Sequence, residues 1–292
     1  MALRIPKARL MMDDPYTYEI LPMQKGQNPY IDIRYNAAHN HTNITTQYHR
    51  VLAAFREILL GPLPPRDVPL PDIVFVANGG LSLPRLGSPL VLLPNMKYPQ
   101  RKAELPSLRE MFRILGIPTI DYPGHEPFEG QAELKWFDGG RKCIGGYGHR
   151  ATKAAFTELA AFFEKVYGKE NAPEMLVVKL SSPNFYHLDV AMFEHDDTKC
   201  ILHRGAFAPT SIRKIETFLG GGENVCVIDT TDHFCLNAVV DGDRVITHKL
   251  TDPAIKKIIE QRTGRTIHQC PTTEFEKSGG SVRCMTLDVH LA

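Results

Sequence analysis

A repeated order of elements constrains the fold of this 292-residue chain more than any other feature. Residues 132–148 alternate as two strands around an Asp-Gly turn, 151–168 have the apolar period of an amphipathic helix, and 174–181 form the apolar run of a buried strand. The same hairpin–helix–strand order is found in three further segments: 72–123, 188–229 with a turn at Asp196-Asp197, and 234–270 with a turn at Asp241-Gly242. The chain is therefore predicted to consist largely of one repeated unit.

A fifth unit is predicted from the two ends of the chain. It would combine a C-terminal strand at 284–290 with a strand at 30–36 and a helix over 45–61. Units of this size cannot each bury an apolar face alone, so they must pack against one another, and a unit shared by both termini implies a closed ring. The pattern thus predicts an α/β propeller of fivefold pseudo-symmetry, in one domain over residues 1–292. A mixed α+β sandwich stays open, because the units share element order and turn position rather than residues.

Charge and cysteine usage exclude several classes of partner. The 34 basic and 33 acidic residues nearly cancel, and no Lys/Arg cluster is typical of binding to nucleic acid or to an anionic membrane. Residues 1–16 have no apolar run long enough for a signal peptide, and no segment approaches the length of a membrane span, so a cytosolic protein is expected. The six cysteines occur singly and are expected to be reduced thiols. A small molecule or a protein fits better as partner, and a homo-oligomer stays open.

In a ring, polar residues at the inner ends of successive units face a common cavity. These residues are Asn78, Glu129, His187, Asp189 and Cys284. Asp189, two positions beyond His187, is expected on the same face of a strand. A thiolate attacks an electrophilic carbon, a histidine transfers protons, and carboxylates hold a cation. The electrophile that matches is a guanidinium, which is planar, always charged and rich in N–H donors. Its charge would also lower the pKa of the Cys284 thiol.

Three ordered motifs carry a resemblance to a known family. They are "FEGQAE" at 128–133, "YHLDV" at 186–190 and "SGGSVRCMT" at 278–286. Together they resemble the guanidine-modifying superfamily, the amidinotransferases and amidinohydrolases of pentein fold, over most of the chain from about residue 71 onward. The resemblance implies a five-bladed α/β propeller, which agrees with the repeats, and a chemistry that needs no metal or cofactor.

The resemblance also implies roles for individual residues. Cys284 would be the nucleophile and His187 the general acid and base. Asp189 and Glu129 would bind the guanidinium, and Glu129 would also orient His187. Arg150 matches the arginine that usually clamps the α-carboxylate of the substrate.

Two departures from the family pattern bear on the substrate. Asn78 stands where the deiminases have an acidic residue, and Ala132 and Glu133 replace the usual Gly-Asp. Asn78 and Glu133 are expected to bind the substrate, and the second departure leaves the exact contacts with the guanidinium open. The asparagine is shared with the arginine dihydrolases, which this chain also resembles in "NAVV" at 237–240 and "RKAELPSLREMF" at 101–112. That subgroup converts arginine to ornithine, ammonia and carbon dioxide. A neutral amide can both donate and accept hydrogen bonds, and so could hold a ureido intermediate for a second attack.

Other readings of these residues stay open. A lone cysteine beside a strand is more often structural than catalytic, Asn78 before two glycines is typical of a turn, and Arg150 before a helix is a common solvated charge. His39 and His41 are two residues of a metal-ligating type, but without a third ligand at useful spacing they are expected in a loop or a substrate-entry segment. Alternative functions are dimethylarginine hydrolysis, arginine deimination to citrulline, amidino transfer to an amine, and a non-catalytic binding module.

Overall fold

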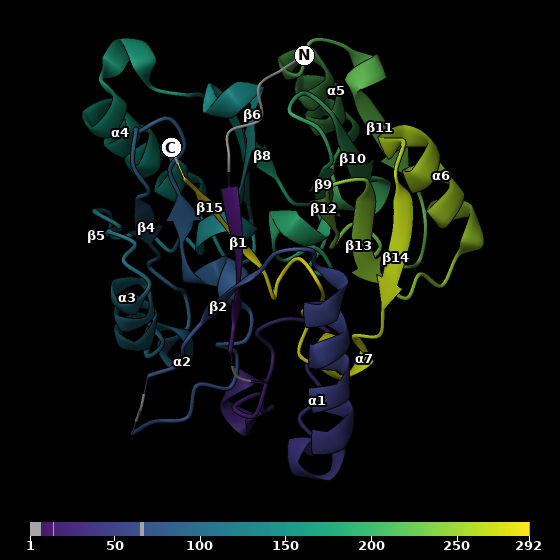
Figure 1. Ribbon diagram of the computed structural model, residues 1–292. Coiled ribbons are helices and arrows are strands. Elements are labelled where there is room, and N and C mark those ends of the chain that lie inside the picture. Colours follow the sequence, from purple (N-terminus) through teal and green to yellow (C-terminus); the bar gives the residue numbers. More distant parts are fainter. Residues whose placement is uncertain (1–6, 14, 65–66, 292) are drawn as a thin grey trace.

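Five three-stranded sheets form the computed structural model, which describes residues 7–13, 15–64 and 67–291 (Figure 1). In every sheet the first two strands are antiparallel, and the third strand is parallel to the middle one. A parallel third strand requires a crossover, and in each unit the crossover contains at least one α-helix. The longer helices lie around the outside of the molecule. The predicted pentein architecture, an α/β propeller of five hairpin–helix–strand units, is confirmed.

Four units follow one another along the chain. The first contains β3 (Leu81–Ser82), β4 (Val91–Leu93), α3 (Leu105–Ile114) and β5 (Thr119–Asp121). The second contains β6 (Leu134–Phe137), β7 (Lys142–Tyr147), α4 (Lys153–Tyr167) and β8 (Glu174–Lys179). The third contains β9 (Met192–Glu194), β10 (Cys200–His203), α5 (Pro209–Phe218) and β11 (Val225–Ile228). The fourth contains β12 (Val239–Asp241), β13 (Arg244–His248), α6 (Pro253–Thr263) and β14 (Thr266–Cys270). The short helix α2 (Pro99–Lys102) lies within the first unit, between β4 and α3, and the short helix α7 (Thr273–Glu276) lies between β14 and the last strand of the chain.

The two ends of the chain do form the fifth unit, but the N-terminal strand is not the predicted one. β15 (Leu287–His290) pairs with β1 (Lys7–Met12), and α1 (Ala37–Ala54) leads to β2 (Leu59–Gly61). The predicted strand at 30–36 is wrong. There the side chain of Asp32 accepts a hydrogen bond from the backbone N–H of Arg34 at 3.0 Å, which bends the chain into a turn.

Three further predictions of local structure are wrong. Residues 71–78 are turns leading into a 3₁₀ helix, Val76–Gly79, and not a strand. His39 and His41 lie in α1, which begins after Asn36, whose side chain accepts a hydrogen bond from the His39 N–H. β8, predicted as a buried strand, is half-exposed over most of its length because it is the outer strand of its sheet.

The apolar core lies between neighbouring units. In one cluster Phe137 and Ile144 of the second unit pack with Met192 and Leu202 of the third. Such shared burial is the expected behaviour of units that cannot fold alone, and it leaves the inner ends of the sheets to polar residues. No helix in the described ranges is both long enough and apolar enough to cross a membrane.

Candidate active site

The predicted site residues occupy equivalent places in their units, in short irregular turns just before the first strand. Asn78 lies in the 3₁₀ helix Val76–Gly79, Glu129 directly precedes the 3₁₀ helix Gly130–Ala132, and Cys284 lies in the turn before β15. His187 precedes the 3₁₀ helix Leu188–Val190, and Asp189 lies within it. The expectation that His187 and Asp189 share one face of a strand is therefore wrong, because the backbone there is not extended.

Glu129 is the centre of the first group of contacts. Its Oε2 lies 2.8 Å from His187 Nε2 and accepts hydrogen bonds from Asn78 Nδ2 at 3.2 Å and from the Arg150 guanidinium at 2.9 Å. Asn78 Nδ2 is also 3.2 Å from His187 Nε2, and Glu133 Oε1 is 3.8 Å from the same nitrogen. All five side chains are buried. The structure thus brings together five of the predicted residues.

The charges in this group differ because their neighbours differ. Burial opposes ionisation of Glu129, but Arg150 and the hydrogen bond to His187 outweigh it and hold the pKa of Glu129 well below its usual range. Burial lowers the pKa of His187, an effect that Glu129 partly offsets. Burial and the nearby Glu129 charge raise the pKa of Glu133 well above its usual range. His187 is therefore placed as a neutral base beside a charged carboxylate.

Cys284 and Asp189 form the second group, together with Asn237, which the sequence analysis did not single out. Cys284 Sγ lies 3.5 Å from Asp189 Oδ2 and 3.1 Å from Asn237 Nδ2. Burial, and then the Asp189 carboxylate, raise the pKa of the Cys284 thiol above its usual value. Asn237 lies two residues before β12, the first strand of the fourth unit, which matches the place of the predicted site residues before the first strands of their own units. This position in the repeat, and not a local motif, is the signal that could have found it.

A small cavity connects the two groups, and both His187 and Cys284 line it. Gln27, Asn28 and Ile31 from the segment before α1 form part of its wall. Among the described residues, no hydrogen-bond donor reaches two buried carboxylate oxygens of the site, Asp189 Oδ1 and Glu133 Oε2. Buried acceptors of this kind are costly unless a ligand supplies the missing donors.

Two arginines also line the cavity. Arg150 was predicted to clamp the carboxylate of the substrate. In the structure its guanidinium donates a hydrogen bond to Glu129 and lies over the rings of Tyr98 and Tyr186, at 4.9 and 5.1 Å from their centroids. Arg101 was missed by the sequence analysis. It is buried, pairs with Glu104 at 2.6 Å and donates to Asn78 Oδ1 at 3.4 Å.

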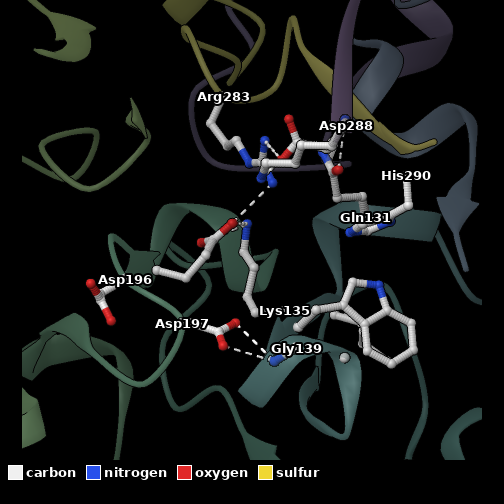
Figure 2. Close-up of a pocket in the computed structure, with 13 residues that line it drawn as sticks. Gln131, Lys135, Gly139, Asp196, Asp197, Arg283, Asp288 and His290 are labelled. Carbon is white, nitrogen blue, oxygen red and sulfur yellow. Dashed lines mark hydrogen bonds and ion pairs between the residues drawn. The ribbon is translucent and has the colours of Figure 1, made fainter. Parts of the chain in front are cut away.

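On the other side of the Cys284 turn, the side chain of Arg283 points away from the cavity into a second, charged pocket (Figure 2). It donates to Asp288 at 3.1 Å and to Glu194 at 2.9 Å, and Glu194 also pairs with Lys135 at 3.3 Å. These buried ion pairs connect the second and third units to the segment that carries the thiol. In the described ranges no three His, Cys, Asp or Glu residues lie close enough to hold a metal ion.

Comparison with known proteins gives relatives with related activities, although no family model matches the chain. The bifunctional arginine dihydrolase/ornithine cyclodeaminase AgrE of Nostoc sp. is 30% identical over 220 residues, which are 75% of this chain and 29% of AgrE. The dimethylarginine dimethylaminohydrolase of Mycobacterium tuberculosis is 28% identical over 224 residues, covering 76% of this chain and 67% of that protein. This chain therefore matches less than a third of the bifunctional relative.

Solved structures agree with these sequence matches. The apo structure of ArgZ, an arginine dihydrolase from cyanobacteria, superimposes with a TM-score of 0.80 at 25% identity, over 97% of this chain and 40% of ArgZ. A dimethylarginine dimethylaminohydrolase adduct has a TM-score of 0.66 at 18% identity, over 97% of this chain and 99% of that chain, which supports the fold alone.

Proposed function

This chain belongs to the guanidine-modifying superfamily of pentein fold, near its arginine dihydrolases, and we propose that it hydrolyses the guanidino group of arginine or a close relative with Cys284 as nucleophile. One observation carries the proposal. A buried thiol lies beside the carboxylate of Asp189, and Asp189 and Glu133 each leave one buried oxygen without a donor in the described structure. A guanidinium would supply N–H donors to both oxygens and positive charge to both carboxylates.

The substrate would also activate the thiol. Burial and Asp189 raise the pKa of Cys284, so little thiolate exists in the free protein at neutral pH. A guanidinium bound next to Asp189 neutralises that carboxylate and places positive charge near the sulfur, which lowers the pKa of the thiol. Attack is then coupled to binding of a cationic substrate.

The reaction follows from the positions of the two groups. His187 takes the proton that the Cys284 thiol loses, and the resulting thiolate adds to the guanidino carbon, forming a C–S bond. His187 then passes this proton to one nitrogen, and the C–N bond breaks to release ammonia. Neutral His187, held by Glu129 at 2.8 Å, then removes a proton from a water molecule that adds to the same carbon. The C–S bond breaks, the thiolate returns, and a ureido product is formed.

Asn78 is the reason to prefer arginine dihydrolysis. Its amide bonds Glu129 and lies 3.2 Å from His187, where a carboxylate would add a negative charge. A neutral amide can hold the neutral ureido group by donating and accepting hydrogen bonds, so that Cys284 attacks a second time. The second round releases carbon dioxide and a second ammonia and leaves ornithine. A cytosolic setting completes the proposal, since all six cysteines are free thiols.

Product analysis tests the proposal. Purified protein is incubated separately with arginine, dimethylarginine and agmatine, and ornithine, citrulline and ammonia are quantified, with Cys284→Ser as the control. We expect ornithine and about two ammonia per arginine, absent in the control. Citrulline as the final product would move the chain to the deiminase or dimethylarginine branch. Turnover only with an added amine would indicate a transferase, and no turnover of any guanidine would leave a binding module.

Asn78→Asp separates one round of hydrolysis from two. The added negative charge should still allow the first attack on the cationic guanidinium, but it should weaken binding of the neutral ureido intermediate. The ratio of citrulline to ornithine should therefore rise by about tenfold or more. An Asn78→Asp protein with an unchanged product ratio would remove Asn78 from the explanation of the second round.

A further inference from the structure

We infer that Asn237 is a further catalytic residue of this site, and that its amide N–H stabilises the thiolate of Cys284 by a direct hydrogen bond. The catalytic meaning of this inference rests on the proposed function. Its chemical content, stabilisation of the thiolate, can be measured without any substrate.

The orientation of the Asn237 amide is set by its own contacts. Oδ1 accepts two backbone hydrogen bonds, from the Arg283 N–H at 2.8 Å and from the Cys284 N–H at 3.2 Å. Both partners are donors only, so the oxygen of the amide must be on this side. Nδ2 is thereby directed to Cys284 Sγ at 3.1 Å and to the Asp189 carbonyl oxygen at 3.3 Å. In the described structure, the side-chain hydrogen bonds of this fully buried amide are all with the turn that carries the nucleophile and with Asp189.

The Cys284 sulfur has one neighbour that opposes its ionisation and one that favours it. Among the described residues, the side chains that hydrogen-bond Cys284 Sγ are those of Asp189, whose carboxylate disfavours a thiolate, and Asn237, whose N–H favours one. A hydrogen bond to a charged acceptor is stronger than one to a neutral acceptor, so the contact of Asn237 strengthens when the thiol loses its proton. The contribution is therefore larger for the attacking thiolate than for the resting thiol, as catalysis requires.

A purely structural role for Asn237 predicts something different. If the amide only caps the turn at 283–284, its loss should lower thermal stability without changing the pH at which the sulfur ionises. The matched comparison is Gln131, which Figure 2 shows beside Asp288. Its side chain holds the same segment, by accepting from the Asp288 N–H at 2.9 Å and donating to the Thr286 carbonyl at 3.1 Å, but it does not contact the sulfur.

The experiment measures the pH dependence of Cys284 alkylation by iodoacetamide, followed by mass spectrometry of the peptide that contains Cys284. Asn237→Asp keeps the Oδ1 acceptor for both backbone N–H groups and replaces the donor by an oxygen. In Asn237→Asp we expect the pKa of the Cys284 thiol to rise, because the thiolate loses its donor. The alkylation rate at neutral pH should then fall by about tenfold or more. Asn237→Ala removes the donor without adding charge and should give a smaller change in the same direction. It serves alone if the aspartate variant does not fold.

The control variant and the kinetics distinguish stabilisation of the thiolate from a purely structural role of Asn237. Gln131→Glu should lower the melting temperature but leave the alkylation profile of Cys284 unchanged. An equal shift in Gln131→Glu, or an unshifted profile in both Asn237 variants, overturns the inference. A shift confined to the Asn237 variants supports the thiolate contact even if the wild-type protein turns over no guanidine, so failure of the proposed function is recognised separately. Where turnover is found, the Asn237 variants should lose kcat more than they change KM.

Discussion

Two glutamates of a single motif have opposite electrostatic environments at the residue scale. Glu129 contacts Arg150 and His187 and has a lowered pKa, whereas Glu133 is buried near Glu129 and has a raised pKa. A carboxyl group whose pKa is lowered by folding stabilises the fold at every pH above the usual glutamate pKa. This stabilisation is lost as the pH falls below that value. A raised pKa has the reverse sign, because the folded protein binds the proton more tightly, so stability is lost as the pH rises above the usual value.

We therefore predict that isosteric substitutions at these two positions have opposite effects at pH 8. Glu133→Gln keeps the acceptor for the Ala151 N–H, found at 3.1 Å, and should raise the melting temperature at pH 8 more than at pH 5. Its KM for a guanidine should rise by about tenfold, because the variant loses a carboxyl group that ionises when the positive charge of the guanidinium is bound beside it. Glu129→Gln leaves Arg150 without its anion and should destabilise by about 3–5 kcal/mol at pH 8. Melting curves at both pH values check this, and a destabilised Glu133→Gln at pH 8 would contradict it.

At the element scale, the turn that positions Glu129 depends on one glycine. Gly130 has φ +62°, and a Cβ there would lie 2.5 Å from the backbone oxygen of Gly80. This close approach allows the Gln131 N–H to donate to the Gly80 oxygen at 2.8 Å, which joins the inner turns of the first two units. Only a residue without a side chain combines this φ with this contact.

Gly130→Ala should therefore displace Glu129 and reduce turnover by at least about tenfold, while destabilising by more than the roughly 1–2 kcal/mol of a left-handed backbone alone. The matched control is Gly264→Ala at the end of α6, where φ is +64° and nothing lies within 4 Å of the added Cβ. That variant should lose only the stability that corresponds to the conformational cost of a left-handed alanine, and it should keep full turnover. Equal melting temperatures and equal activities for the two variants would show that the contact with Gly80 is unimportant.

At the scale of the whole molecule, buried ion pairs hold the units around the axis. Glu194 of the third unit pairs with Lys135 of the second and with Arg283 of the segment leading to β15. Lys135 and Arg283 are almost entirely buried, so each needs its carboxylate. Breaking a buried pair from one side is far more costly than losing an exposed pair.

Glu194→Gln should accordingly destabilise the protein by about 3 kcal/mol or more. Glu110→Gln removes an exposed ion pair of α3 with Arg113 and should change stability by less than about 1 kcal/mol. Chemical denaturation of both variants measures the difference. Similar losses for both would mean that the axial pairs contribute no more than a surface pair.

The sequence by itself determined the repeated unit and most of the site. The turns at Asp196-Asp197 and Asp241-Gly242 followed from period and turn residues, which are local properties. The motif order predicted that Cys284, His187 and Glu129 converge; in the structure His187 lies 2.8 Å from Glu129 and lines one cavity with Cys284. The superfamily and the fold inferred from them are supported by the relatives.

Tertiary structure alone decided which segments complete the ring and the cavity. The sequence predicts the N-terminal strand at 30–36, but pairing with β15 across the ring selects residues 7–12 instead, where Leu10 and Met11 become buried. Asn237 likewise looks like an ordinary residue before a strand. Its contact with Cys284 joins residues far apart in sequence, and no local pattern encodes a hydrogen bond whose two partners meet only when the ring closes.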